Sequence, residues 1–488
     1  MTTVELEQQR LLIGGEWVPA TGDATFSKTD PFTGETVTLA AAAGRDDARR
    51  ACDAAAAAFD GWAATPPAER RRLLLAAADL LKERAPQVAS VMTEEVGGTF
   101  GWGMFNCDLA SRMLREAAAQ AYAPGGEVIP SDVPGLNATA IRQPVGVVVG
   151  MAPWNAPVIL STRALAAPLA FGNTVVLKAS ERCPRTHAAV VAALHDAGVP
   201  AGVVNLVIHE PSGAPDVVDE LIAHPAVRRV NFTGSTRVGR IVAAKCAAHL
   251  KRSLLELGGK APMVVLPDAD LDEAAAAASF GAFMNSGQIC MSTERIVADT
   301  SVADELGAKL ADRAGALVVG DPRDQGTMIG PVIDDAARTR VLELIEDARA
   351  KGATVLAGGD ADGNCVTPTV LAGVTPEMRI YGEESFGPVV AIVTVDGTDE
   401  AVRVANDTEY GLAAAVFGRD VPAALGVARR IDSGICHVNG STVHDEPQMP
   451  FGGVKASGWG RFGGKAALDE FTELRWVTVQ ESPRHYPI

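Results

Sequence analysis

The chain has 488 residues, too many for one ordinary hydrophobic core, so two or three structural units are expected. Hydrophobic residues make up 47% of the chain and charged residues 21%, which is typical of a folded α/β protein and argues against a disordered one. With 43 lysines and arginines against 60 aspartates and glutamates, the net charge is −17. This charge argues against nucleic acid and anionic membranes as partners.

The cysteines and the N-terminus bear on the cellular compartment. Seven cysteines lie far apart without CxxC pairs or metal-like Cys/His spacing, and their odd number argues against a complete disulfide set. No metal site is predicted. Met1 to Arg10 is polar and lacks the apolar core of a signal peptide, and no stretch reaches about 18 uninterrupted apolar residues. We therefore expect a cytoplasmic protein.

The first half of the chain predicts helices packed on a parallel sheet. Alanine and leucine recur at helical spacing over residues 46–60 and 68–96, which indicates amphipathic helices. Short β-branched apolar runs alternate with helix-like stretches after them, at residues 145–149, 174–177, 203–208 and 227–232. This alternation favours a parallel sheet with both faces covered, an architecture that commonly binds nucleotides.

Residues 125–143 break this pattern. Pro130, Pro134 and Gly135 separate two short extended segments, which predicts a hairpin that projects from the body. The tail over 475–479 alternates like an edge strand and could pair with another element, such as the hairpin of a second subunit.

A second series of strands and helices begins after Glu256 and predicts a second domain. Its expected strands are 263–266, 295–298, 389–395, 413–417 and 435–438, and its expected helices start at Leu271 and cover 303–316 and 336–351.

Two polar motifs follow strands of the first predicted sheet, where a doubly wound sheet delivers its loops to a ligand crevice. Asn155, in Pro153-Trp154-Asn155, could donate its amide to a developing oxyanion, with a Pro-Trp turn and a capping Asn as the alternative. Lys178 and Glu181 could bind ribose hydroxyls. A glutamate there disfavours a 2′-phosphate, which predicts NAD over NADP, and a solvated ion pair is the alternative.

A third motif joins a strand to a helix. Gly234 and the amides that follow it, in the run FTGSTRVG that ends at Gly239, could bind a pyrophosphate at the helix N-terminus. A simple N-cap is the alternative.

The fourth motif pairs Glu256 with Cys290. A glutamate among leucines and glycines is costly to bury unless it is partnered or has a raised pKa, and a raised pKa suits a general base that activates water. Cys290 follows the permissive backbone of Gly287, where the sulfur can stay accessible. The alternative is a small buried hydrophobe, which is our interpretation of the other six cysteines.

Together these motifs resemble those of the aldehyde dehydrogenase superfamily over nearly the whole chain. LELGGK around Glu256 resembles the family's glutamate motif and GQIC ending at Cys290 its cysteine motif, 34 residues apart as in the family. The other motifs also resemble family motifs and occur in the family order: PWN, Lys178 with Glu181, Gly234-Ser235, and EESFGP at 383–388.

The resemblance implies an α/β, aldehyde dehydrogenase-like fold with two Rossmann-like open-sheet domains and a small β oligomerisation arm. Residues 1–124 and 144–254 would form the NAD-binding domain, 255–468 the catalytic domain, and 125–143 with 469–488 the arm. A homodimer or homotetramer is implied.

The resemblance also assigns roles. Cys290 would attack a small-molecule aldehyde as a thiolate, Asn155 and the Cys290 backbone N–H would hold the oxyanion, and Glu256 would activate water to hydrolyse the thioester. NAD would accept hydride, with NADP less favoured. The implied cofactor contacts are Trp154, Lys178, Glu181, Gly234, Ser235, Gly239, Leu257, Glu384 and Phe386.

Residues 437–453 and 459–464 resemble bacterial aromatic aldehyde dehydrogenases of the vanillin, benzaldehyde and salicylaldehyde type. An aromatic aldehyde needs a mostly apolar slot, and the predicted walls are Ile289, Met291, Val443 and His444. His444 could instead lie in a surface loop, and Ser385 stands where the family usually has an aliphatic residue. An aliphatic or semialdehyde substrate, a cysteine-dependent esterase and a non-catalytic binding protein are the alternatives.

Overall fold

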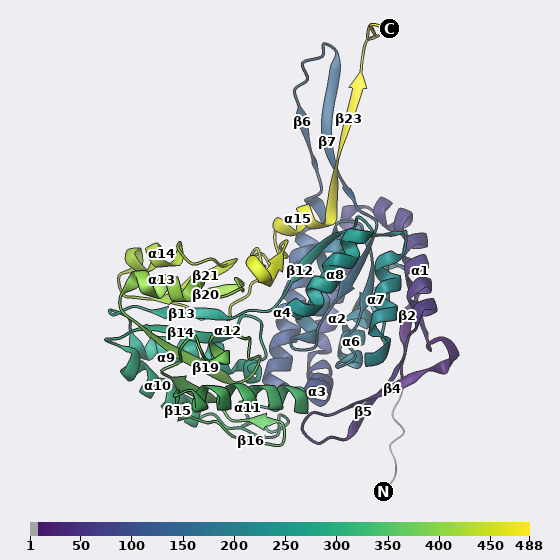
Figure 1. The fold of residues 1–488 in the computed structure, drawn as a ribbon. Coiled ribbons are helices and arrows are strands. Elements are labelled where there is room, and N and C mark those ends of the chain that lie inside the picture. The colour runs from purple at the N-terminus through teal and green to yellow at the C-terminus, as the bar shows by residue number, and fades with distance from the viewer. Residues whose placement is uncertain (1–7) are drawn as a thin grey trace.

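Two large open sheets covered by helices form the body of the molecule, and a narrow three-stranded arm projects from it (Figure 1). The computed structural model describes residues 8–488. The expectation that Met1 to Arg10 holds no signal peptide falls largely on residues 1–7 and therefore lies outside the described residues. Within 8–488, no helix is both long and apolar enough to cross a bilayer.

The first sheet is parallel at its centre, as predicted. Its central strands are β8 (Val147–Met151), β9 (Thr174–Lys178), β10 (Val204–Val207), β11 (Val227–Thr233) and β12 (Arg252–Glu256), and its edges are β2 (Leu11–Ile13), β3 (Glu16–Val18) and β22 (Gly458–Trp459). The strand order is β22-β12-β11-β8-β9-β10-β2-β3. The chain runs from β8 outward to β10 and then returns to β11 beside β8, so the direction of winding reverses between β8 and β11. Ligands of open α/β sheets bind at such a reversal.

Eight helices pack around the first sheet: α1 (Arg45–Ala64), α2 (Pro67–Glu83), α3 (Ala85–Val96), α4 (Phe100–Ala119), α5 (Pro157–Ala170), α6 (Pro184–Asp196), α7 (Ala214–Ala223) and α8 (Thr236–Ala248). The helical stretch predicted over 68–96 is two helices, because Pro86 has no N–H for an internal helical bond and stands in the first turn of α3. The helix α4 was not predicted from the sequence, because Gly101 and Gly103 weaken the helical signal.

The second sheet begins directly where the first one ends. β12 finishes at Glu256 and β13 starts at Ala261, so residues 257–260 carry the chain from one sheet to the other. The strand order is β15-β18-β19-β14-β13-β20-β21, parallel except for the β15 edge. The strands are β13 (Ala261–Val265), β14 (Thr293–Asp299), β15 (Thr354–Ala357), β18 (Thr369–Ala372), β19 (Val389–Val395), β20 (Ala413–Phe417) and β21 (Ile435–Val438). The helices are α9 (Leu271–Phe283), α10 (Ala303–Gly315), α11 (Asp335–Ala350), α12 (Arg379–Gly382), α13 (Thr398–Asn406) and α14 (Val421–Ala428).

The arm consists of β6 (Gly126–Ile129), β7 (Leu136–Pro144) and β23 (Thr472–Gln480), with α15 (Ala466–Phe471) at its base (Figure 1). β23 pairs antiparallel with β7 along its whole length, from Thr472 opposite Pro144 to Gln480 opposite Leu136. The tail therefore pairs with the hairpin of its own chain.

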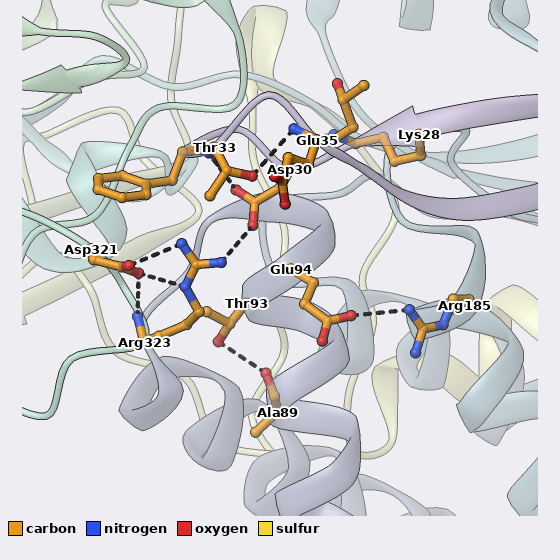
Figure 2. A network of polar contacts seen from close by, with 12 residues as sticks. Lys28, Asp30, Thr33, Glu35, Ala89, Thr93, Glu94, Arg185, Asp321 and Arg323 are labelled. Atoms are coloured by element: carbon orange, nitrogen blue, oxygen red, sulfur yellow. Dashed lines mark hydrogen bonds and ion pairs between the residues drawn. The ribbon is translucent and has the colours of Figure 1, made fainter. Parts of the chain in front are cut away.

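A polar network fastens the N-terminal strands to the layer of the second sheet (Figure 2). Asp30 is buried and accepts hydrogen bonds from the backbone N–H groups of Phe32 and Thr33, at 2.7 and 3.1 Å. Arg323, from the loop between α10 and α11, donates to Asp30 at 3.2 Å and to Asp321 at 2.8 Å. The small elements of this region are β1 (Gln8–Gln9), β4 (Thr25–Thr29), β5 (Thr36–Ala41), β16 (Ala361–Asp362) and β17 (Cys365–Val366).

Candidate active site

One cavity of about 430 Å³ lies where the loops after β8 and β11 meet the second sheet. This is the position that a doubly wound sheet offers to a ligand. The predicted site residues that line it are Trp154, Asn155, Gly234, Ser235, Glu256, Leu257, Cys290, Glu384 and Phe386.

A strained turn presents Cys290. Asn285, Ser286 and Gly287 all have positive φ, at 51, 55 and 69°. A Cβ on Gly287 would lie 2.0 Å from the Gly387 carbonyl oxygen, so only glycine allows the two segments to approach. The Gln288 side-chain oxygen accepts a hydrogen bond at 2.9 Å from a backbone N–H of the loop before α11. These constraints fix the backbone at Cys290 before any substrate arrives.

The environment of Cys290 favours the neutral thiol. The residue is partly accessible from the cavity, but dense protein surrounds its sulfur. Burial raises the pKa of the Cys290 thiol to about 12, with a further rise from the Glu256 carboxylate, while Arg163 acts in the opposite direction. At neutral pH the resting group is therefore a thiol and needs activation to become a nucleophile.

Glu256 ends β12 and faces the same cavity. The residue is 2% exposed, and neither carboxylate oxygen has a hydrogen-bond partner among the described residues. Burial raises the pKa of Glu256 well above its usual value, although Arg163 and Arg461 lower it. An unpartnered buried carboxyl of raised pKa is suited to take a proton from water.

Asn155 connects the loop after β8 to the nucleophile turn. Its side-chain amide donates to the Gln288 carbonyl at 2.9 Å, which leaves its second N–H free. Its own backbone carbonyl accepts from Trp102 Nε1 at 3.1 Å and from Asn285 Nδ2 at 3.0 Å. Trp102 was not predicted as a site residue, because α4, the helix that carries it, was not predicted.

The N-terminus of α8 opens onto the cavity. Gly234 and Ser235 line it, and the Ser235 hydroxyl caps the helix by accepting from the Val238 N–H at 3.4 Å. Gly239 lies one turn further along and packs on Leu257, where a Cβ would come within 2.4 Å of the leucine Cδ2. The free amides and the dipole of this helix end favour an anionic group such as a phosphate.

The loop before β19 supplies Glu384 and Phe386. Glu384 accepts from the Gly259 N–H at 2.9 Å, and burial, followed by the charge of Glu294, raises its pKa to about 7. The ring of Phe386 meets that of Trp154 edge to face, with centroids 5.8 Å apart. Arg340 and Tyr410 also line the cavity, but as isolated residues outside any motif they gave no signal in the sequence.

Lys178 and Glu181 lie beside this cavity and do not line it. They follow β9, the strand next to β8. Burial lowers the pKa of Lys178, and the Glu181 carboxylate opposes that shift. The pair therefore lies at the end of the strand next to the one that leads to Trp154 and Asn155.

The predicted substrate walls divide into two groups. Ile289 and Met291 are the sequence neighbours of the nucleophile and are buried, and Val443 is half-buried against the same apolar cluster. None of the three is among the described residues that line the cavity. His444 is not brought to the nucleophile: its side chain is 55% exposed, and its Nε2 lies 3.1 Å from Glu446 Oε1. This placement agrees with the alternative interpretation of His444 as a surface loop residue.

Arg163 on α5 is a buried charge that sequence analysis did not select. It forms an ion pair with Asp445, and its guanidinium lies 4.0 Å above the ring of Phe451. These residues line a second, small cavity of about 50 Å³, and the charges of Arg163 and Asp445 both act on Glu256. One arginine within the otherwise uncharged segment of α5 was the available signal.

The described residues form neither a metal-binding cluster nor a disulfide. No group of three or more His, Cys, Asp or Glu side chains within residues 8–488 is arranged to hold a metal ion. All seven cysteines are free thiols.

Comparison with known proteins gives consistent matches. Residues 17–477 match the model of the Aldehyde dehydrogenase family. A vanillin dehydrogenase of Pseudomonas fluorescens is 55% identical over 98% of this chain and 99% of its own length. A benzaldehyde dehydrogenase (NAD(+)) of Pseudomonas putida is 40% identical over 98% and 97%. The crystal structure of a salicylaldehyde dehydrogenase from Pseudomonas putida G7, complexed with salicylaldehyde, has a TM-score of 0.97 at 45% identity and covers 99% of this chain and 100% of that one.

Proposed function

The chain belongs to the aldehyde dehydrogenase family, and we propose that it oxidises an aromatic aldehyde to the carboxylic acid with NAD, using Cys290, Glu256 and Asn155. The observation that carries this proposal is that a nucleophile, an unpartnered buried carboxyl and a free amide N–H from three separate segments meet in one cavity. That set of groups suits acyl chemistry on sulfur.

The residues around the cavity fit a nicotinamide dinucleotide. The N-terminus of α8 at Gly234 and Ser235 suits the pyrophosphate, and the Glu384 carboxylate suits ribose hydroxyls. Trp154 and Phe386 offer aromatic walls beside the nucleophile. The chemistry that a bound dinucleotide supplies is acceptance of a hydride from the sulfur-bound carbon.

The protein's own groups then account for the remaining steps. The Cys290 thiol first loses its proton to solvent, and the thiolate then bonds to the aldehyde carbon. The resulting oxyanion accepts hydrogen bonds from the Asn155 amide and the Cys290 N–H. Once that carbon has lost hydride, it is a thioester. Glu256 takes a proton from water while the water oxygen bonds to the carbon. The carbon–sulfur bond breaks, which releases the acid and returns the thiolate.

An aromatic substrate is supported by the names of the relatives and by the apolar neighbours of the nucleophile. Ile289 and Met291 are buried on either side of Cys290, and Trp102 packs beside Asn155. The test is NADH formation with substituted benzaldehydes against short aliphatic aldehydes. We expect a higher kcat/KM for the aromatic set. A clear aliphatic preference would favour the aliphatic or semialdehyde alternative and leave the family assignment intact.

A preference for NAD is supported by Glu181, whose carboxylate would repel a 2′-phosphate. Lys178 and Arg182 lie nearby, but Arg182 is engaged with Asp334 at 2.7 Å. We expect a higher kcat/KM with NAD than with NADP and a smaller ratio in Glu181→Gln. Equal or better catalysis with NADP in the natural protein would overturn this preference.

A homodimer or homotetramer built through the arm is supported by apolar side chains that the arm exposes. Leu474 and Trp476 lie two residues apart on β23, hence on one face of it, and are 60% and 74% exposed. Val128 on β6 is 84% exposed. Apolar groups so far from the body are better explained by a second copy than by water.

A further inference from the structure

A buried ion pair joins the segment that follows Glu256 to the segment that follows Cys290. Lys260 Nζ donates to Glu294 Oε2 at 2.6 Å, and these two residues are 1% and 4% exposed. Burying two charges is expensive, and such a pair often adds little stability over apolar side chains of the same size. Its presence beside the cavity therefore calls for a reason other than stability.

The pair joins the two chemically important segments of the chain. Lys260 follows Glu256 by four residues and immediately precedes β13, and Glu294 follows Cys290 by four residues and belongs to β14. β13 and β14 are adjacent parallel strands (Figure 1), paired at Ala261 and Thr293. The ion pair thus holds the segment of the base against the segment of the nucleophile.

The same carboxylate also holds the loop that carries Glu384 and Phe386. Glu294 accepts from the Ser385 N–H with both oxygens at 3.0 Å, from the Ser385 hydroxyl at 2.5 Å, and from the Phe386 N–H at 3.1 Å. Phe386 has a positive φ of 50°, an uncommon conformation for a bulky residue. Four hydrogen bonds to one carboxylate maintain that strained backbone.

From these contacts we propose that Glu294, with Lys260 and Ser385, is a positioning residue that sets the loop of Glu384 and Phe386 against the cofactor cavity. The inference rests on the proposed function, because it assigns that loop to the dinucleotide. Glu294 itself does not line the cavity and touches no reacting atom.

The negative charge of Glu294 has a second effect that distinguishes positioning from plain structural support. It raises the pKa of Glu384, whereas Lys260 lowers that pKa. Removing the charge of Glu294 therefore lowers the pKa of Glu384, so that the carboxylate persists to more acidic pH. Removing only the Ser385 hydroxyl keeps the charge and should leave this titration in place.

The test uses the full-length protein with Ser385→Ala, Glu294→Gln and the control Thr38→Val. Thr38 also donates its hydroxyl to a buried carboxylate, that of Glu95 at 2.9 Å, but outside the cavity. Measurements are the NADH Kd by fluorescence titration, its pH dependence, KM and kcat with NAD, and Tm. We expect NADH Kd and KM for NAD to rise about tenfold in both site variants, with kcat less affected. In Thr38→Val only Tm should fall.

The pH dependence gives the sharper result. We expect NADH binding by the natural protein to weaken as pH falls through about 7, where Glu384 takes up a proton. That transition should move to lower pH in Glu294→Gln and stay in place in Ser385→Ala. An unchanged NADH Kd in Ser385→Ala alongside a lowered Tm would overturn the inference. If Glu294→Gln does not fold, the NADH Kd of Ser385→Ala decides the question by itself. A natural protein that neither binds NADH nor oxidises aldehydes would instead refute the proposed function.

Discussion

At the residue scale, the environment of Glu256 sets both the kinetics and the stability that we expect. The carboxyl is buried without a partner, and burial holds its pKa well above the usual value. Such a group is available as a base only when it has lost its proton. The same burial makes the ionised form unfavourable in the folded protein, so the proposed activity and the stability have opposite requirements at this position.

Replacing Glu256 by Gln should slow thioester hydrolysis by roughly 100-fold or more. Acylation and the first hydride transfer should persist, so stopped-flow absorbance should record a burst of NADH followed by a low steady rate. In the natural protein the steady rate should fall as pH drops through the raised pKa, because protonation removes the base. A steady rate in Glu256→Gln equal to that of the natural protein would place the base elsewhere.

The same variant should be more stable than the natural protein by about 1 to 3 kcal/mol at mildly alkaline pH. Since the folded-state pKa is raised, the protonated carboxyl adds stability below the unfolded-state pKa, and this is lost as pH rises through the folded-state value. Glutamine carries no charge and avoids that loss. Thermal melts at several pH values should show a gain in Tm that grows with pH, and a gain independent of pH would contradict this account.

At the element scale, the parallel strands could be predicted from the sequence, but the site residues that belong to no sequence motif could not. The strands of both sheets carry dense β-branched runs, and the motifs that follow β8, β11 and β12 do line one cavity. Three such residues lie on helices: Trp102, Arg163 and Arg340. Each acts through contacts with residues far away in the sequence, and a local sequence pattern does not encode such contacts. The break between α2 and α3 was visible only as Pro86.

At this scale, Gly287→Ala tests the close packing of the nucleophile turn. The added Cβ would meet the Gly387 carbonyl oxygen at 2.0 Å, on a backbone with positive φ. We expect a loss of about 2 to 4 kcal/mol and nearly complete loss of activity. Gly426→Ala is the control, since open space surrounds that site within α14 and alanine should stabilise it by roughly 0.5 to 1 kcal/mol. Comparable Tm values for the two variants would refute the packing argument.

At the scale of the whole molecule, the arm keeps its strands together within one chain while leaving apolar side chains exposed. Trp476→Ser should weaken association and lower the mass measured by light scattering, because it removes the largest exposed apolar group of β23. Leu425→Ser, on α14 in the body, is the matched control and should leave the mass unchanged. An unaltered mass in Trp476→Ser at low protein concentration would contradict assembly through this face.

The central claim is that the Cys290 sulfur forms a covalent bond to the substrate carbon. Trapping the acyl-enzyme tests this claim most directly. The Glu256→Gln variant is mixed with benzaldehyde and NAD, and the protein is then analysed by intact-mass and peptide mass spectrometry. We expect one added benzoyl group on the peptide that contains Cys290, and none on Cys436, the other partly buried cysteine. NADH formation without an acyl group on Cys290, or an acyl group on another residue, would contradict the account.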